Sequence, residues 1–526
     1  MDETAPLLPN AQRTQQRLDD HSLQNFPEVA GENRPIGPRL LASLVIDSIP
    51  VILSYILQNS IQTVSIVITG RLGPEELSAA AFSMMLAYVT GEMIPRPVGW
   101  CIALGGGSAL DTLGSQAFTG GSRSTDLSVH FQRCVVLLWI LLIPVGVLWV
   151  FMEPVLLAIK EPPRLCKDVQ DILRILLFGA PGYIAFESLK KYLQCQGHIR
   201  PLTYQYAGIM KAATWVLIMI SPINIALNIF LVHYTSLGML GCPVALSITY
   251  WCAFFLLIAV TSMSSMHKQN ATWGGFQPKA VFNIESCVGF LKLALPGILM
   301  VGTEWAAFEI VALAAGRLGE LPLAAQSVIM TTDQIISTLP FGFGVVASNR
   351  IGNLIGARTA IGARNAAHAI ALISVIVGFA VMIVMLAARN KFGYIFSDDE
   401  DVVRLVSKVM PLVASFQIAD GLANSCGGVL RGQGRQHLGA VFNFVAYYIL
   451  ALPIGITLAF KIGLGLQGLW IGQVIGLFTV GLSEYGVVWL GTNWDREIQK
   501  GIKRNAEEAK RRVLAERIRQ EDGLTN

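Results

Sequence analysis

Apolar residues gather along this chain into long runs separated by short polar segments. Twelve runs reach about 20 residues, the length that an α-helix needs to cross the hydrocarbon core of a bilayer. They are centred near residues 55, 85, 140, 180, 217, 252, 300, 335, 377, 417, 450 and 478. The pattern therefore predicts an all-α polytopic membrane protein with twelve transmembrane helices.

The composition supports this interpretation because charge is scarce. The 526 residues are 53% hydrophobic and 14% charged, whereas about 25% of residues are charged in soluble proteins. The net charge of +4 gives no reason to expect a nucleic-acid partner. The eight cysteines stand singly without a CxxC spacing, so we expect neither a disulfide framework nor a metal site.

The loops between the apolar runs predict the orientation in the membrane. Counted from the N-terminus, the even-numbered hairpins carry the basic residues Arg123, Lys190, Lys191, Arg200, Lys268, Lys279, Arg350, Arg358, Arg364, Arg431 and Arg435. The positive-inside rule places these hairpins in the cytosol. Both termini are then expected there too, and so is the sequon at Asn270. The first 40 residues lack the apolar core of a signal peptide.

The two halves of the chain repeat each other. Pro50 matches Pro296, two GRLG tetrapeptides coincide, and Leu77 matches Leu323, all at an offset of 246. Two six-helix lobes of the same orientation, parallel repeats about an axis along the membrane normal, would leave a cavity between them. We expect a disordered cytosolic tail over residues 1–40, an N-terminal lobe over 41–263 and a cytosolic linker over 264–288. A C-terminal lobe over 289–491 and a charged cytosolic tail over 492–526 follow.

Residues 92–99 interrupt this repeat. The octapeptide EMIPRPVG places two prolines and two charges in the second predicted helix. Each interior proline costs a helix about 3 kcal/mol. We interpret the segment either as an insertion particular to this chain or as a gene-model artefact, and in both cases as lying outside the working site.

Carboxylates at membrane depth are the main candidates for a site. Glu304 and Glu309 lie in the seventh predicted helix, Asp333 in the eighth and Asp420 in the tenth. We expect no Lys or Arg at the same depth. Acids without countercharges hold a proton more readily and can exchange it for a cation. The alternative, preferred for Asp333, is a protonated carboxyl group that hydrogen-bonds a neighbouring helix.

The spacing of these acids suggests a division of roles. Glu304 and Glu309 are five residues apart, about 140° around a helix, so they do not point at one spot. We expect Glu304 to face the cavity with Asp420 as its partner and Glu309 to support them. The further cavity candidates, polar or able to contact flat cations through aromatic rings, are Gln58, Trp305, Tyr55, Tyr88 and Asn424. The alternative for the aromatic residues is helix packing.

Several motifs resemble the multidrug and toxic compound extrusion (MATE) family, in its eukaryotic, fungal-like branch. They are GRLG at 70–73, SALDTLGSQAF at 108–118, LPGILMVGTEWAAFE at 295–309, PFGFGVVASNRIGNLIGA at 340–357 and GGVLRGQGRQHLGAVFN at 427–443. The resemblance implies a V-shaped, twelve-helix antiporter that exports organic cations, drugs or toxic metabolites in exchange for protons. It implies no cofactor, no enzymatic activity and a monomer. It also implies coupling acids at Glu304, Glu309 and Asp420.

Other functions stay open at this stage. A flippase or exporter of an amphipathic or lipid-linked substrate is one alternative, although it would favour basic cavity residues, and sodium is an alternative coupling ion. The N-terminal tail matches an acidic dileucine sorting signal at Glu3, Leu7 and Leu8, which would favour a vacuolar membrane over the plasma membrane. The charged C-terminal tail has apolar residues at helical spacing and could rest on a leaflet or be solvated.

Overall fold

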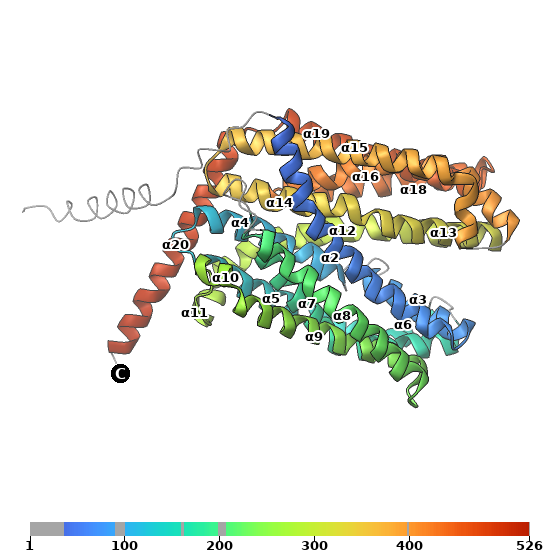
Figure 1. Cartoon of the computed structure of the whole chain (residues 1–526), viewed down its shortest axis with the longest axis horizontal. Coiled ribbons are helices and arrows are strands. Elements are labelled where there is room, and N and C mark those ends of the chain that lie inside the picture. The colour runs from blue at the N-terminus through green and yellow to red at the C-terminus, as the bar shows by residue number, and fades with distance from the viewer. Residues whose placement is uncertain (1–35, 90–99, 159–161, 198–206, 397–398, 525–526) are drawn as a thin grey trace, which may run out of the picture.

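A computed structural model describes residues 36–89, 100–158, 162–197, 207–396 and 399–524 (Figure 1). These residues form helices and no strands, as the apolar runs predict. The proposed sorting residues Glu3, Leu7 and Leu8 lie outside the described residues, and so does the octapeptide 92–99.

The helices follow the predicted order. The N-terminal lobe contains α2 (Pro38–Gly70), α3 (Pro74–Val89), η1 (Ile102–Gly106), α4 (Ser108–Gly120), α5 (Asp126–Val150), α6 (Met152–Ala158), α7 (Pro163–Gln194), α8 (Ala207–His233), η2 (Gly238–Leu240) and α9 (Gly241–Met263). The linker contains α10 (Ser265–Asn270) and α11 (Pro278–Val281).

The C-terminal lobe has the corresponding elements and one additional helix. They are α12 (Ile284–Leu318), α13 (Glu320–Ile336), α14 (Thr338–Gly356), α15 (Ala360–Phe392), η3 (Gly393–Ile395), α16 (Glu400–Gln433), α17 (Gln436–Phe444), η4 (Val445–Ala451), α18 (Leu452–Ile456), η5 (Thr457–Lys461), α19 (Leu466–Trp489) and the additional α20 (Trp494–Leu524).

Two of the predicted spans are not single long helices within the described residues. In the described part of the chain, ten helices are long and apolar enough to cross a membrane. The other two predicted spans correspond to α3 with η1 and α4, and to α13 with α14, which Ser337 separates.

Local sequence signals set several helix ends. The Asp399 carboxylate accepts hydrogen bonds from the backbone N–H groups of Asp401 (2.8 Å) and Val402 (3.3 Å) and so caps α16. Asn283 caps α12 in the same way through the N–H of Ser286. Gly434 ends α16 in the left-handed conformation (φ +79°), which glycine adopts without a steric penalty.

The two lobes converge at the end of the molecule where α20 lies and diverge toward the other end (Figure 1). At the converging end, α4 and α14 are in close contact, and the Thr119 hydroxyl donates to the Asn353 carbonyl across 2.7 Å. Gly356 faces the backbone of Gln116 so closely that a β-carbon would lie 2.6 Å from its carbonyl oxygen. The lobes are therefore sealed against each other at this end.

The first half of α2 also belongs to the contact between the lobes. Leu44, Val51 and Tyr55 share an apolar core with residues of α14, α15 and α16. Asp47 pairs with Arg350 of α14 across 3.6 Å. The first half of α2 thus packs on the C-terminal lobe, although α2 is the first helix of the N-terminal lobe.

Five basic residues that the loop count placed in hairpins lie inside long helices, so that assignment is wrong for them: Arg350 in α14, Arg364 in α15, and three near the ends of α7 and α16. Helix α7 continues to Gln194 and α16 to Gln433, and Lys190, Lys191 and Arg431 are buried within these helices. Lys190 and Lys191 form ion pairs with Glu187 and Asp111, each across 2.7 Å. Hydropathy did not mark these helix ends because they are polar segments that protein, rather than lipid, surrounds.

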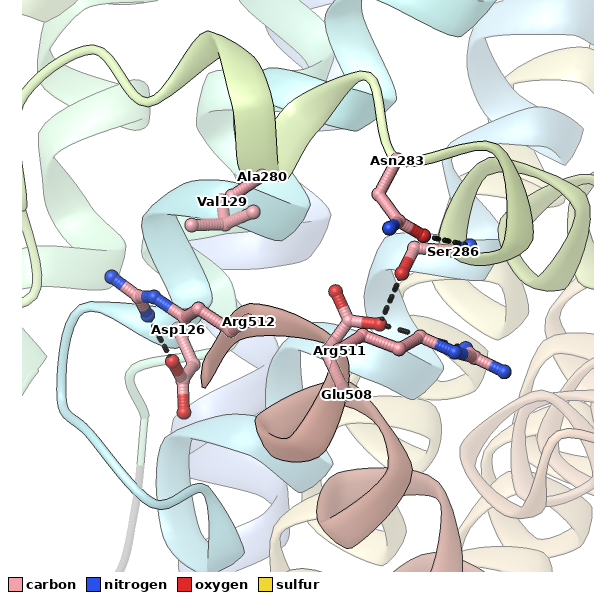
Figure 2. A pocket seen from close by; sticks show the side chains of 8 residues that line it. All are labelled: Asp126, Val129, Ala280, Asn283, Ser286, Glu508, Arg511 and Arg512. Carbon is pink, nitrogen blue, oxygen red and sulfur yellow. Dashed lines mark hydrogen bonds and ion pairs between the residues drawn. The ribbon is translucent and has the colours of Figure 1, made fainter. Parts of the chain in front are cut away.

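The C-terminal helix α20 lies across the ends of both lobes (Figure 1). Figure 2 shows its contact with α5 and α12, where Arg512 pairs with Asp126 and the Ser286 hydroxyl donates to Glu508. These side chains line a crevice of about 10 Å³. One face of the expected charged tail is therefore packed on protein.

Candidate functional site: a cavity between the lobes

A cavity of about 350 Å³ lies between the two lobes. Its wall combines the middle of α2 and α7 on one side with α12, α13, α16 and α19 on the other. The structure brings together every candidate cavity residue whose side chain it describes: Glu304, Glu309, Asp333, Asp420, Gln58, Tyr55, Trp305 and Asn424. Tyr88 lies in α3, but its side chain is outside the described residues. The functional roles of these residues stay predictions.

Glu304 of α12 and Asp420 of α16 are the two central acids. The Tyr447 hydroxyl donates to Glu304 Oε1 across 3.5 Å. Asp420 is 3% exposed, and the Asn424 side chain donates to its Oδ1 across 2.7 Å. Its other oxygen, Oδ2, has no hydrogen-bond partner among the described residues. Neither acid forms an ion pair within the described part of the chain.

Two further acids line the same cavity. Gln417 of α16 donates to Asp333 Oδ1 across 2.8 Å, so a hydrogen bond joins Asp333 to a neighbouring helix. It nevertheless faces the cavity, as does Glu309. Glu304 and Glu309 lie on different sides of α12, but the cavity is wide enough that both line it.

A basic side chain, Arg431, also lines the cavity. The expectation that the acids would have no cation at their depth is therefore wrong. Arg431 belongs to the last turn of α16, and its charge acts on Glu304. Its Nη2 has no hydrogen-bond partner among the described residues. Arg431 looked like a loop residue in the sequence because it adjoins the turn at Gly434.

Glu484 of α19 is a fifth acid in the cavity and is not among the candidates predicted from the sequence. This side chain is 0% exposed and lines the cavity wall. The signal was present, since Glu484 is a single carboxylate inside the twelfth apolar run. The same signal, an isolated charge within an apolar run, applies to Glu187 in α7.

The N-terminal lobe contributes a wall that is polar but has its charges paired. The Glu187 carboxylate accepts hydrogen bonds from Tyr55 (3.0 Å) and Gln58 (3.2 Å) and pairs with Lys190. Lys190 also donates to Gln58 Oε1 across 2.7 Å and lies 3.7 Å from the centre of the Tyr55 ring. Tyr183 accepts a hydrogen bond from Gln58. The unpaired acids thus lie in the C-terminal lobe.

The arrangement suits an organic cation. Five carboxyl groups and one guanidinium line the cavity, together with aromatic rings such as Tyr55, Trp305 and Phe308. Cations are attracted both to carboxylates and to the faces of aromatic rings. The volume falls in the usual range for small-molecule sites, about 300–1,000 Å³. Among the described residues no group of His, Cys, Asp and Glu could hold a metal ion.

The sequence matches the profile of the MatE family over residues 50–230 and 296–457. A transporter of Schizosaccharomyces pombe is 37% identical over 463 residues, which are 87% of this chain and 80% of that protein. Multidrug and toxin extrusion protein 2 of Mus musculus is 33% identical, over 92% of this chain and 81% of that protein. Multidrug and toxin extrusion protein 1 of Homo sapiens is 31% identical, over 88% and 76%.

Solved structures have the same architecture. The crystal structure of the eukaryotic MATE transporter AtDTX14 matches with a TM-score of 0.79 and 28% identity, over 89% of this chain and 99% of that one. A Vibrio cholerae MATE transporter matches with a TM-score of 0.67 at 15% identity, which supports the fold alone. The predicted fold, twelve helices in two lobes, is confirmed by these matches.

Proposed function

This chain belongs to the MatE family of membrane transporters and is not an enzyme, and we propose that it exports organic cations, drugs or toxic metabolites in exchange for protons. The transport mechanism is alternating access, in which the cavity between the lobes opens first to one side of the membrane and then to the other. No cofactor takes part.

The observation that carries this proposal is the position of Glu304 and Asp420 in one cavity, without an ion pair to either among the described residues. Ionised carboxylates in such a place need a counterion. The substrate cation supplies the positive charge in one half of the cycle, and a proton neutralises the acids in the other. Binding of one therefore excludes the other, which is what couples the two fluxes.

The other cavity residues have supporting roles in this proposal. Asn424 holds the Asp420 carboxylate through its hydrogen bond. Glu309 and Asp333 add negative charge to the entrance path. Trp305 and Tyr55 offer ring faces to flat cations, and we assign Tyr88 and Gln58 to the same lining.

The orientation follows from the loops that carry basic residues. The sealed end, where α4 meets α14 and α20 crosses the lobes, is proposed to face the cytosol together with both termini. The structure is then the outward-facing state, poised to accept a proton and release its substrate. We propose a monomer in the vacuolar or the plasma membrane, with Glu3, Leu7 and Leu8 as the vacuolar sorting signal.

Arg431 favours one alternative function. A guanidinium in the cavity is the group that would recognise an anionic headgroup, as a flippase or exporter of an amphipathic or lipid-linked substrate requires. Sodium is the alternative coupling ion, because carboxylates bind it as well as protons. The experiment below distinguishes these possibilities.

The test is uptake of a fluorescent organic cation into proteoliposomes under an imposed pH gradient. We expect uptake by the unmodified protein and its loss in Glu304→Gln and Asp420→Asn. Glu320→Gln, an exposed acid in the same lobe, should transport normally. Uptake that persists in both cavity variants would refute the mechanism. Uptake driven only by a sodium gradient would assign the other ion, and movement of a labelled anionic lipid without cation uptake would favour the flippase.

A further inference from the structure

The Glu484 carboxylate lies in a position that the proposed exchange at Glu304 and Asp420 does not use. It is lodged between α16 and α17, where both neighbouring helices present a glycine. A β-carbon on Gly427 would lie 3.3 Å from Glu484 Oε2, and one on Gly439 would lie 3.1 Å from Oε1. The side chain of Met300 fills the remaining space beside both glycines. These neighbours leave room for a carboxyl group but offer it no side-chain donor.

The surroundings of Glu484 favour its neutral form. The side chain is 0% exposed, and neither carboxylate oxygen has a hydrogen-bond partner among the described residues. Burying an ionised carboxylate without a partner costs far more than burying a neutral carboxylic acid. The neutral form is therefore the one that costs less to bury here, although the group borders the cavity.

A base lies within reach of this acid. Arg431 follows Gly427 by four residues, so the two lie on one face of α16, about 5–6 Å apart. No salt bridge joins Arg431 to Glu484 in the described structure, and Arg431 Nη2 is without a hydrogen-bond partner there. A change of rotamer in the long Arg431 side chain would carry the guanidinium along α16 by about one helical turn, to the carboxylate.

The other ionisable groups near Glu484 come from α16, α12 and η4. Arg431 and Glu304 are the charged groups that act on it, from α16 and α12. Tyr447 and Cys426 are the further titratable side chains in its field. Of these, Arg431 alone can stabilise the ionised form of Glu484.

We propose that Glu484 is a second proton site of the transport cycle and that Arg431 expels its proton. When the cavity rearranges, the O–H bond of the Glu484 carboxyl group breaks, the proton passes to water, and the carboxylate pairs with the guanidinium. In the next half-cycle the pair separates and Glu484 takes up a proton again. This inference rests on the proposed proton exchange and adds to it: two protons move per univalent cation, so the exchange carries net charge.

The number of protons can be measured with tetraethylammonium in proteoliposomes. With the membrane potential clamped at zero, net flux stops when the cation concentration ratio across the membrane equals the proton concentration ratio raised to a power. That power is the number of protons exchanged for each cation. We expect a power of two for the unmodified protein and one for Glu484→Gln. Gln473→Leu removes a buried polar group three turns away on α19, outside the cavity lining, and should keep the power of two.

Arg431→Met provides a second variant in case Glu484→Gln fails to fold. Without the guanidinium, Glu484 keeps its proton throughout the cycle, so this variant should also give a power of one. A power of one in the unmodified protein, or of two in either variant, would overturn the second proton site and leave the exchange at Glu304 intact. Absence of any pH-driven flux in the unmodified protein would instead refute the proposed function, and the second site with it.

A separate set of contacts, made by α20, joins the two lobes at the sealed end. The Arg504 guanidinium donates to Gln116 Oε1 of α4 (3.0 Å) and to the carbonyl oxygen of Gln433 at the end of α16 (2.8 Å). One turn further on, the Glu508 carboxylate binds Arg133 of α5 across 2.7 Å. Helix α20 therefore bridges the N-terminal and C-terminal lobes.

The two parts of this bridge differ in chemistry. The contacts with the C-terminal lobe include an apolar part, since Trp494 and Ile498 are buried and Gly501 lies against Ile355. Beside it lie polar contacts with the ends of α16 and α12, at the Gln433 carbonyl and the Ser286 hydroxyl. On the N-terminal lobe the contacts are ionic or polar, as in the pair between Arg512 and Asp126 (Figure 2). The pair between Arg512 and Asp126 is only 12% and 11% exposed, but both partners regain hydration when they part. The apolar contacts of Trp494 and Ile498 have no such compensation in water, so the side on the N-terminal lobe separates first.

We infer that α20 is a latch that stays on the C-terminal lobe and releases the N-terminal lobe when the sealed end opens. Labelling of Thr119→Cys by a thiol reagent reports that opening, because Thr119 is buried between α4 and α14. Arg512→Ala should speed labelling by about five-fold or more, as expected for the loss of one largely buried ion pair. Lys503→Ala, an exposed residue of the same helix, should not.

The exchanged pair Asp126→Arg with Arg512→Asp tests the same contact without removing it. It should restore slow labelling, whereas Asp126→Asn alone should behave like Arg512→Ala. The protein that keeps Thr119 is labelled in parallel, and its rate gives the labelling of the native cysteines, which is subtracted. Equal labelling rates in the unmodified protein and in Arg512→Ala, or fast labelling in the exchanged pair, would overturn the latch.

Discussion

The Lys190 ammonium group lies 2.7 Å from a carboxylate oxygen of Glu187, and neither side chain is exposed to solvent. The pair also fixes two cavity residues, because Glu187 accepts from Tyr55 and Lys190 donates to Gln58. Removing one member of a buried ion pair leaves an uncompensated charge, which typically costs about 3–5 kcal/mol.

We therefore expect Lys190→Met to lower the free energy of unfolding by about 3–5 kcal/mol, measured by denaturation of the purified protein in detergent. The double variant with Glu187→Gln should lose less, because no lone charge stays buried. Lys167→Met, an exposed position of the same helix, should change stability by less than about 0.5 kcal/mol. A double variant less stable than Lys190→Met would contradict this account.

Trp305 should contribute to the affinity for aromatic cations. Its ring borders the cavity beside Glu304, and a cation over a desolvated ring gains about 2 kcal/mol. Trp305→Ala should thus weaken binding of a flat aromatic cation about ten- to thirty-fold and that of tetraethylammonium less, as measured by competition for uptake. Trp215→Ala, on an exposed face of α8, is the control. Equal losses for both cations would argue against a ring contact.

The docking of α20 should depend on pH through Glu508. Burial raises the pKa of Glu508, but His130, Arg133 and the hydrogen bond from Ser286 together lower it more, so its pKa lies below the ordinary value of 4.5. The ionised Glu508 carboxylate therefore stabilises the docked helix above about pH 4.5. This stabilisation is lost as the pH falls through the lower pKa that Glu508 has in the folded protein. Cleavage of α20 by an acid-active protease should accelerate in that range, and Glu508→Gln should remove the acceleration.

Gly356 should tolerate no side chain. A β-carbon there would lie 2.6 Å from the Gln116 carbonyl oxygen on the other lobe, so α4 and α14 would have to separate. We expect Gly356→Ala to lower the free energy of unfolding by about 1–3 kcal/mol. Gly486→Ala, where no neighbouring atom lies within 4 Å, should be neutral or stabilising because alanine favours the helix. Stability equal to that of the unmodified protein in Gly356→Ala would contradict the close contact.

The proposed orientation predicts that Asn270 carries no glycan. This residue lies in a sequon of the linker, and its side-chain nitrogen donates to Gln196 across 3.3 Å. Glycosylation takes place on the side of the membrane opposite the cytosol. A change in electrophoretic mobility after glycosidase treatment, lost in Asn270→Gln, would overturn the cytosolic placement of the linker.

The sequence alone predicted the helices, the two lobes and four of the five acids that line the cavity. Hydrophobic runs of bilayer length define helices without any tertiary information, because a lipid-exposed helix must be apolar along its whole length. Acids within such runs, such as Glu304 and Asp420, are conspicuous for the same reason. The repeat then predicted a cavity between the lobes, and the candidates with described side chains line one.

Only the tertiary structure decided which charges are paired and where the charged helices end. Lys190 and Arg431 looked like loop residues, because a helix surrounded by protein can continue with polar residues that hydropathy does not count. The pairing of Glu187 with Lys190, the isolation of Glu484 between two glycines and the docking of α20 all depend on residues distant in sequence. The energy of a charge in a membrane protein depends on its spatial neighbours, so the sequence shows that a buried charge exists and the fold determines its role.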